Sequence, residues 1–292
     1  MLQQLKKYFP SLQSYKKTPT ELNEKLTWFF TESGQIISID PSEINEKESV
    51  LLHMLFKPYK HNFPPSTEEE IKWQQYIQAD GELPKIENSF RLIFFQIPKD
   101  QLQPADFKDA LNQLFEKDII ILWESEIKGV IVDIKLADYE EEISLEEIID
   151  VLMSDLYTKI RFFVSPYLTE VEQAKYHFDQ LISQASVVFS YSDNNVISYI
   201  EAIPYMLIEQ LTLELKDELQ NLIPQEFQHD KEFLRMMEVF LKSNLNVSVA
   251  AKKLYMHRNS LQYRIEKFKE KTDLDIRNFH HALTVYLALL IK

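Results

Sequence analysis

Glycine is nearly absent from this chain: only Gly34, Gly81 and Gly129 occur among its 292 residues. Phosphate-binding loops need several glycines close together, because the backbone amides must approach the anion closely. No such cluster exists here, which argues against a Walker-type or Rossmann-type nucleotide site. The same scarcity indicates a helix-rich protein with few tight turns.

Composition sets further limits on the class of protein. The absence of cysteine excludes a disulfide framework, a thiolate zinc site and a cysteine nucleophile. Neither a signal-peptide pattern nor an apolar run of the roughly 20 residues that a membrane helix needs is visible. We therefore expect a soluble cytoplasmic protein without a membrane partner, and no residue pattern calls for a metal ion or a cofactor.

Charge is distributed unevenly along the chain. Residues 229–292 contain twelve Lys and Arg against seven Asp and Glu, a net charge of +5. The whole chain carries −14, so the remaining residues carry −19. This asymmetry predicts a polyanion-binding end on a body that repels polyanions, although a solvated charged face would give the same count.

Residues 1–85 are expected to form an N-terminal α/β domain of unknown role. The β-rich runs 26–30 and 35–39 predict a hairpin with Gly34 in its turn. A helix over residues 42–56 follows, with Leu51, Leu52 and Leu55 on its apolar face. Thr67 and Glu70 have the spacing of a capping box and open a second helix.

Residues 86–224 predict a ferredoxin-like, palm-type domain with a connecting helix, which makes the chain α+β. The expected order is β-α-β-β-α-β, in which an antiparallel sheet carries helices on one face. The segments that give this order are residues 90–97, 104–117, 119–124, 130–135, 145–157 and 160–164. A long helix from Thr169 follows, and then a helical run over residues 199–222.

Residues 225–292 are expected to be an all-α domain that contains a helix-turn-helix. Ala250, Ala251 and Leu254 give the first short helix a small apolar face, which lets the second helix approach closely. The second helix, residues 258–272, carries Leu261, Ile265 and Phe268 as one apolar stripe. Tyr255 stands in the turn, where many such units have a glycine with positive φ, at some cost in backbone strain.

The opposite face of the second helix predicts contact with duplex DNA. Arg258, Asn259, Gln262 and Tyr263 lie near its N-terminal end, where side chains reach base edges. Lys252, Lys253, Arg264 and Lys267 suit phosphate contacts. An amphipathic helical hairpin with ordinary solvated charges remains the alternative interpretation of this pattern.

This segment resembles the C-terminal helix-turn-helix of the PucR/CdaR family, regulators of purine catabolism and of carbohydrate diacid use. The resemblance rests on the alanine pair at 250–251, His257-Arg258-Asn259-Ser260-Leu261, Tyr263-Arg264 and Thr272-Asp273-Leu274-Asp275. Ser260 stands where the family usually has Thr, and Asp273 where it has Gly. The subtype is similar to the DNA-binding end of the factor for inversion stimulation. The resemblance implies that His257, Arg258, Ser260, Gln262 and Tyr263 face DNA.

The middle block also resembles that family, whose members place a degenerate diguanylate-cyclase-like palm domain ahead of the DNA-binding end. A working cyclase needs a glycine pair and acidic residues on the central hairpin. Here that hairpin reads WESEIKGVIV, with the single Gly129, so we expect no enzymatic activity. Glu124, Glu126 and Asp133 are nearby acids that also fit a solvated turn and a strand end.

Taken together, these features predict a transcriptional regulator that binds duplex DNA as a homodimer, with upstream domains that dimerise or sense an unidentified small-molecule effector. The alternatives are a protein-interaction module that has lost DNA binding and a nucleotide-sensing protein that retains the fold. Salt-insensitive binding to a protein partner would favour the first alternative. Nucleotide-dependent thermal stabilisation would favour the second.

Overall fold

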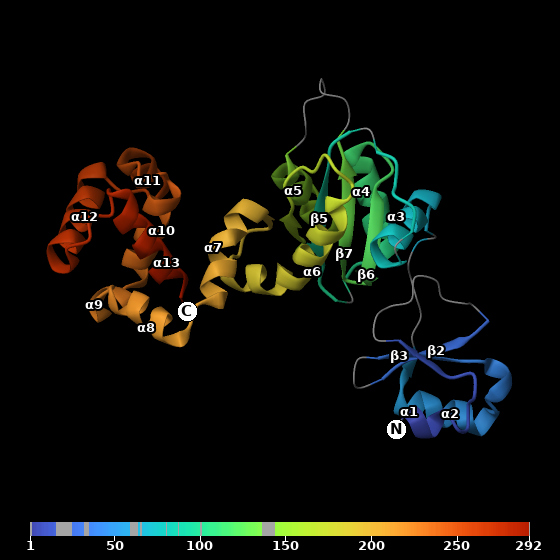
Figure 1. Cartoon of the computed structure of the whole chain (residues 1–292). Helices are drawn as coiled ribbons and strands as arrows, with labels where there is room; N and C mark the ends of the chain where they lie inside the picture. The colour runs from blue at the N-terminus through green and yellow to red at the C-terminus, as the bar shows by residue number, and fades with distance from the viewer. Residues whose placement is uncertain are drawn as a thin grey trace. The chain divides into compact units, whose positions relative to one another are not determined.

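A computed structural model describes residues 2–15, 25–31, 35–58, 64, 66–79, 81–86, 88–99, 101–135 and 144–291 of the chain. The chain divides into two compact units, residues 1–185 with 194–199 and residues 186–193 with 200–292. Figure 1 traces their elements along the chain. No helix among the described residues combines the length and the apolar character that crossing a membrane requires.

The N-terminal part of the first unit contains a small antiparallel sheet. Strands β2 (Thr27–Phe30) and β3 (Ile36–Ile39) form the predicted hairpin, while the expected turn residue Gly34 lies outside the described residues. The sheet order is β1-β3-β2-β4, with β1 at Gln13–Tyr15 and β4 at Lys57–Pro58. A short helix α1 (Leu2–Leu5) and a 3-10 turn η1 (Pro41–Glu43) complete this part.

Helix α2 (Glu46–Leu55) packs on this sheet along a narrower face than the sequence predicted. Leu52 is buried, but Leu51 and Leu55 are 57% and 54% exposed. The small sheet meets only the stripe formed by Leu52 and by Phe56, four residues later. Successive helical residues are 100° apart, so Leu51 turns away from this stripe.

The middle of the chain forms a five-stranded sheet in the order β6-β7-β5-β8-β9. Its first four members are antiparallel and have the predicted ferredoxin-like order, second-third-first-fourth. Strand β9 pairs parallel with β8 and was not predicted, since three residues are too short for a recognisable period. The strands are β5 (Phe90–Gln96), β6 (Ile120–Ser125), β7 (Lys128–Ile134), β8 (Arg161–Val164) and β9 (Val196–Ser198).

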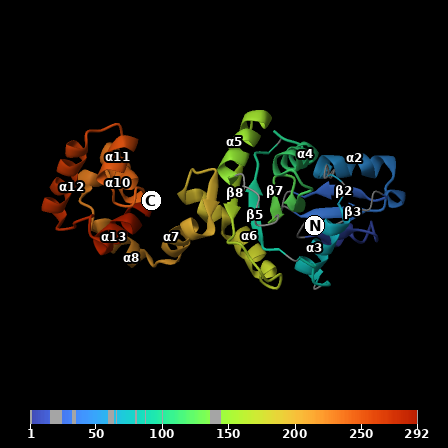
Figure 2. The same ribbon diagram turned by 90° about the horizontal axis from the view of Figure 1, so that it is seen from above.

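Helices cover both faces of this sheet, as Figure 2 shows. Helices α4 (Pro104–Phe115) and α5 (Leu145–Leu156) lie on one face, where Phe95 and Phe162 share a core with Phe107 and Leu152. Helix α6 (Gln173–Tyr191) lies on the other face. The palm-type order predicted only the first layer, because α6 lies outside that repeat.

Gly129 lies within strand β7, opposite Phe95 of β5 and Trp123 of β6. A Cβ atom here would come within 2.7 Å of the Leu122 carbonyl oxygen and 3.0 Å of the Phe95 ring. Glycine is therefore required by close packing inside the sheet. The structure gives this residue a role in packing, and no phosphate-binding loop surrounds it in the described part of the hairpin.

Glu70 connects helix α3 (Glu68–Ala79) to the middle sheet. It forms the predicted capping box, in which Thr67 N–H donates to Glu70 Oε2 at 2.9 Å and Glu70 N–H donates to Thr67 Oγ1 at 3.2 Å. The same carboxylate accepts from Lys108 Nζ at 2.8 and 2.9 Å and from Ile121 N–H at 2.9 Å. Helix α3, which the sequence placed in the first block, thus packs on edge strand β6.

The second unit is helical. The run 199–222 is two helices, because Thr212 caps a new helix by accepting from Leu215 N–H. Pro204 is accommodated inside the first of them. The helices are α7 (Tyr199–Gln210), α8 (Leu213–Asn221), α9 (Gln225–Gln228), α10 (Lys231–Lys242), α11 (Val247–Lys253), α12 (Arg258–Thr272) and α13 (Phe279–Leu290).

Replacing Glu70 with Ala is expected to lower the free energy of unfolding by about 3–5 kcal/mol, because it leaves the buried Lys108 ammonium without its partner. Denaturant unfolding would measure the loss. Glu69→Ala is the matched control, since Glu69 pairs with Lys72 at the exposed surface of the same helix. Equal midpoints for the two variants would contradict this role of Glu70.

Candidate nucleic-acid interface

Helices α10, α11 and α12 pack around one apolar core. Ala250 and Ala251 are almost fully buried, and their small side chains allow α12 to lie close to α11. Leu261, Ile265 and Phe268 form the predicted stripe and are all buried. This packing confirms the inward face of both helices and leaves the other face of α12 exposed.

The turn between α11 and α12 is a Schellman motif built without glycine. Tyr255 N–H donates to the Lys252 carbonyl oxygen at 3.2 Å, and Met256 N–H donates to the Ala251 carbonyl oxygen at 2.9 Å. Tyr255 has a φ of 53°, as the sequence predicted, and its side chain is 98% exposed. Met256 packs against the core and anchors the end of the turn.

The residue that follows the turn caps the N-terminus of helix α12. His257 is the N-cap residue, and its Nδ1 accepts from Asn259 N–H at 3.3 Å. This bond requires an unprotonated Nδ1, which leaves Nε2 of the exposed ring as the donor. At the other end, Asp273 has a φ of 58° and stands where the family resemblance places glycine.

The predicted DNA-facing side chains lie on one exposed surface of α11 and α12, with one exception. That exception is Arg264, which is only partly exposed and pairs with Glu232. The exposed members, which we call the α11–α12 face, are Lys252, Lys253, His257, Arg258, Asn259, Ser260, Gln262, Tyr263 and Lys267.

Cations on these two helices fall into two groups. Arg264, Lys269 and Lys271 form ion pairs with Glu232, Asp275 and Glu226, respectively. Four others make no ion pair within the described part of the chain: Lys252, Lys253, Arg258 and Lys267. These four belong to the α11–α12 face, so its positive charge is not neutralised internally.

A network of ion pairs occupies the flank of α12 formed with the following loop. Arg277 pairs with Asp275 through Nε at 2.8 Å and also pairs with Glu266. The Arg277 guanidinium holds the pKa of the Asp275 carboxyl well below its usual range. Asp275 N–H donates to His281 Nδ1 at 2.9 Å, so His281 supports the loop.

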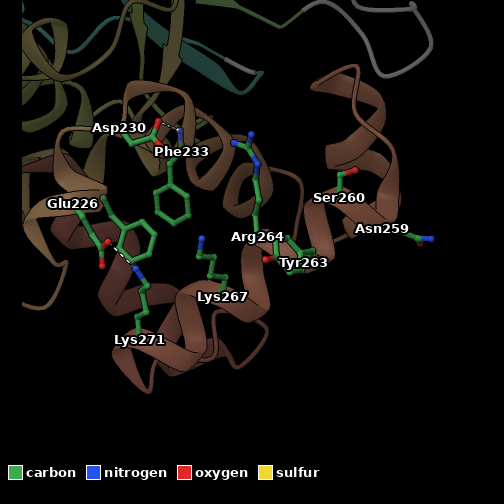
Figure 3. Close-up of a pocket in the computed structure, with 10 residues that line it drawn as sticks. Glu226, Asp230, Phe233, Asn259, Ser260, Tyr263, Arg264, Lys267 and Lys271 are labelled. Carbon is green, nitrogen blue, oxygen red and sulfur yellow. Dashed lines mark hydrogen bonds and ion pairs between the residues drawn. The ribbon is translucent and has the colours of Figure 1, made fainter.

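A groove runs along the other flank of α12, between this helix and the segment that contains α9 and the start of α10. Figure 3 shows Asn259, Ser260, Tyr263, Arg264 and Lys267 along one side of it. The opposite side is lined by Glu226, Phe227, Asp230 and Phe233. Sequence reasoning missed this second side, because its residues follow ordinary helix patterns far from the helix-turn-helix.

Comparisons with known proteins agree with this geometry. The family described as the PucR C-terminal helix-turn-helix domain matches residues 233–291. Protein YxkF of Bacillus subtilis (strain 168) is 30% identical over 282 residues, which cover 92% of each chain.

Two regulators are similar over shorter stretches. The carbohydrate diacid regulator of Escherichia coli (strain K12) is 36% identical over 55 residues, 19% of this chain and 14% of that protein. The purine catabolism regulatory protein of Bacillus subtilis (strain 168) is 30% identical over 89 residues, 30% of this chain and 17% of that protein.

Replacing Tyr255 with Gly is expected to raise the free energy of unfolding by about 0.5–1 kcal/mol, because glycine adopts a positive φ without a Cβ penalty. The exposed Tyr255 ring contributes little packing that could be lost. Tyr255→Ala is the control, since alanine keeps the penalty. Thermal unfolding of the three proteins would test this, and a less stable glycine variant would contradict it.

Proposed function

The chain belongs to the PucR/CdaR-type family of DNA-binding transcriptional regulators, and we propose that it binds duplex DNA through the α11–α12 face. The observation that carries this proposal is the placement, on one exposed surface, of several amide and hydroxyl side chains and of four cations that make no ion pair with any described residue. A helix-turn-helix inserts its second helix into the major groove, and here that helix is α12.

Base recognition falls to the N-terminal half of α12. Arg258 has a guanidinium without an ion-pair partner among the described residues, and it lies in the first turn of the helix. Arginine binds guanine O6 and N7 with two hydrogen bonds, and Asn259 and Gln262 carry the amides that bind adenine. Ser260 and Tyr263 supply hydroxyl groups on the same half of the helix.

Phosphate contact falls to the cations around this half. Lys252 and Lys253 end α11, and Lys267 lies two turns beyond the start of α12. His257, with Nε2 available as a donor, can bind a phosphate oxygen while its Nδ1 caps the helix. Each phosphate neutralised by such a cation releases counterions, so affinity should fall steeply with salt.

The proposal also covers the oligomeric state of the protein and the roles of its upstream domains. The protein works as a cytoplasmic homodimer that reads two half-sites, as helix-turn-helix regulators do. An apolar groove between α13 and the end of α10 with the loop after it, lined by Leu241, Leu245, Phe279 and Leu283, is available to a second copy. The middle domain acts without catalysis, because its one hairpin glycine serves packing, and the upstream part binds an effector or dimerises.

Replacing Arg258 with Ala is expected to weaken binding to the preferred sequence by about 1–3 kcal/mol and to relax the preference at one position. Lys252→Ala should instead weaken binding to all duplexes alike and make the log–log salt slope shallower by about 0.9. Selection from a random duplex library, followed by titrations at two salt concentrations, would measure both effects.

Arg258→Lys is the matched control, since lysine keeps the charge but lacks the planar fork that binds guanine. It should keep the salt slope of the wild type and lose the sequence preference. Unchanged affinity and unchanged preference in Arg258→Ala would show that Arg258 does not read a base.

A further inference from the structure

We propose that Glu232 occupies Arg264 as an internal substitute for a DNA phosphate, and that DNA binding exchanges the carboxylate for a phosphate. This inference rests on the proposed function. It makes Glu232, on a helix outside the helix-turn-helix pair, a residue that lowers the affinity for DNA. Arg264 then contributes to DNA binding only after a carboxylate has left it.

The geometry places the pair beside the DNA-facing surface. Arg264 Nη2 lies 2.8 Å from Glu232 Oε1, a charge-assisted contact of the kind that arginine also makes with phosphate. Arg264 lines the same groove as Asn259, Tyr263 and Lys267, which are residues of the α11–α12 face. A phosphate that enters at Lys267 is therefore presented to the Arg264 guanidinium as well.

Exposure shows that the pair can exchange. The Glu232 side chain is 73% exposed and the Arg264 side chain is 35% exposed. Exposed ion pairs contribute little to stability, because water competes with both partners and each side chain loses conformational freedom. A phosphate of the DNA backbone, fixed at high local charge density, competes well against such a carboxylate.

Helix α12 does not depend on this pair for its position. Leu261, Ile265 and Phe268 are buried in the core shared with α10 and α11, and they hold the helix whether or not the ion pair forms. Glu232 lies in the first turn of α10, where an acidic side chain also interacts favourably with the helix dipole. The Glu232 carboxylate therefore keeps its favourable interaction with the α10 dipole after Arg264 has bound the phosphate.

The groove holds a second pair that differs in its surroundings. Lys271 pairs with Glu226 at 2.7 Å and lies over the Phe227 ring at 5.5 Å, so two partners retain it. It is seven residues beyond Arg264 and farther from the N-terminal half of α12. Lys267, between them, makes no ion pair within the described part of the chain. Among the paired cations of α12, Arg264 is thus the nearest along the helix to the predicted base-reading residues.

Glu232→Gln is expected to bind DNA about three- to tenfold more tightly at low salt than the wild type, with an unchanged log–log salt slope, because Arg264 neutralises the same phosphate in both complexes. The gain arises because the wild type must first break the ion pair between Arg264 and Glu232, which the variant lacks. Titration of the full chain with a duplex enriched by selection and with a random-sequence duplex would measure affinity and slope. The gain should occur with both duplexes, since phosphate contacts carry no sequence information.

Glu238→Gln is the matched control, because Glu238 pairs with Lys242 on the same helix and the change in net charge is identical. It should leave affinity and slope unchanged. In an Arg264→Ala background, Glu232→Gln should give no gain in affinity, since the cation that it releases is missing. Circular dichroism and thermal unfolding would establish that the variants fold alike.

Three outcomes would overturn the inference: Glu232→Gln binds no better than the wild type, it binds worse, or Glu238→Gln shows the same gain. In each case the wild type still binds DNA, and the proposed function stands. Failure of the wild type to bind any duplex would reject the proposed function, and the inference with it.

Discussion

The close packing of α11 against α12 is the contact on which the α11–α12 face depends. Ala250 and Ala251 remove side-chain volume where the two helices meet, and the Leu261–Phe268 stripe fills the space that remains. A larger side chain at either alanine would push α12 outward, since a close-packed core has no room for added volume. The short turn between the two closely packed helices then places Tyr255 at a positive φ, which strains its backbone.

Around this core, the distribution of ion pairs decides which cations can act on a polyanion. Arg277, Asp275 and Glu266 satisfy one another on one flank of α12, while Glu226 and Glu232 engage Lys271 and Arg264 on the other. The helix-turn-helix domain is basic, but about half of the cations on its two helices are already paired. The positive charge that is not paired internally is therefore concentrated on the α11–α12 face. Such a concentration favours one orientation of approach to a polyanion.

Local patterns predicted much of the fold and of the site. The apolar stripe of α12, the capping box of Thr67 and Glu70, and the order of strands and helices along the middle block depend on nearest neighbours and on period, which the residues express directly. The α2 face was predicted too wide and β9 was missed. How much of a helix is covered by a small sheet depends on segments far away in the sequence. The same is true of the strand with which a three-residue strand pairs.

The sequence by itself determined that this chain ends in a basic helix-turn-helix with Arg258, Asn259 and Gln262 on its exposed face, because helical period and side-chain chemistry are local properties. Only the tertiary structure decided that Gly129 has no space for a Cβ atom, that Glu70 meets Lys108, and that Arg264 meets Glu232. The two ion pairs join residues 38 and 32 positions apart, and the space at Gly129 is closed by Leu122 of the paired strand and by the more distant Phe95; no local pattern encodes these contacts.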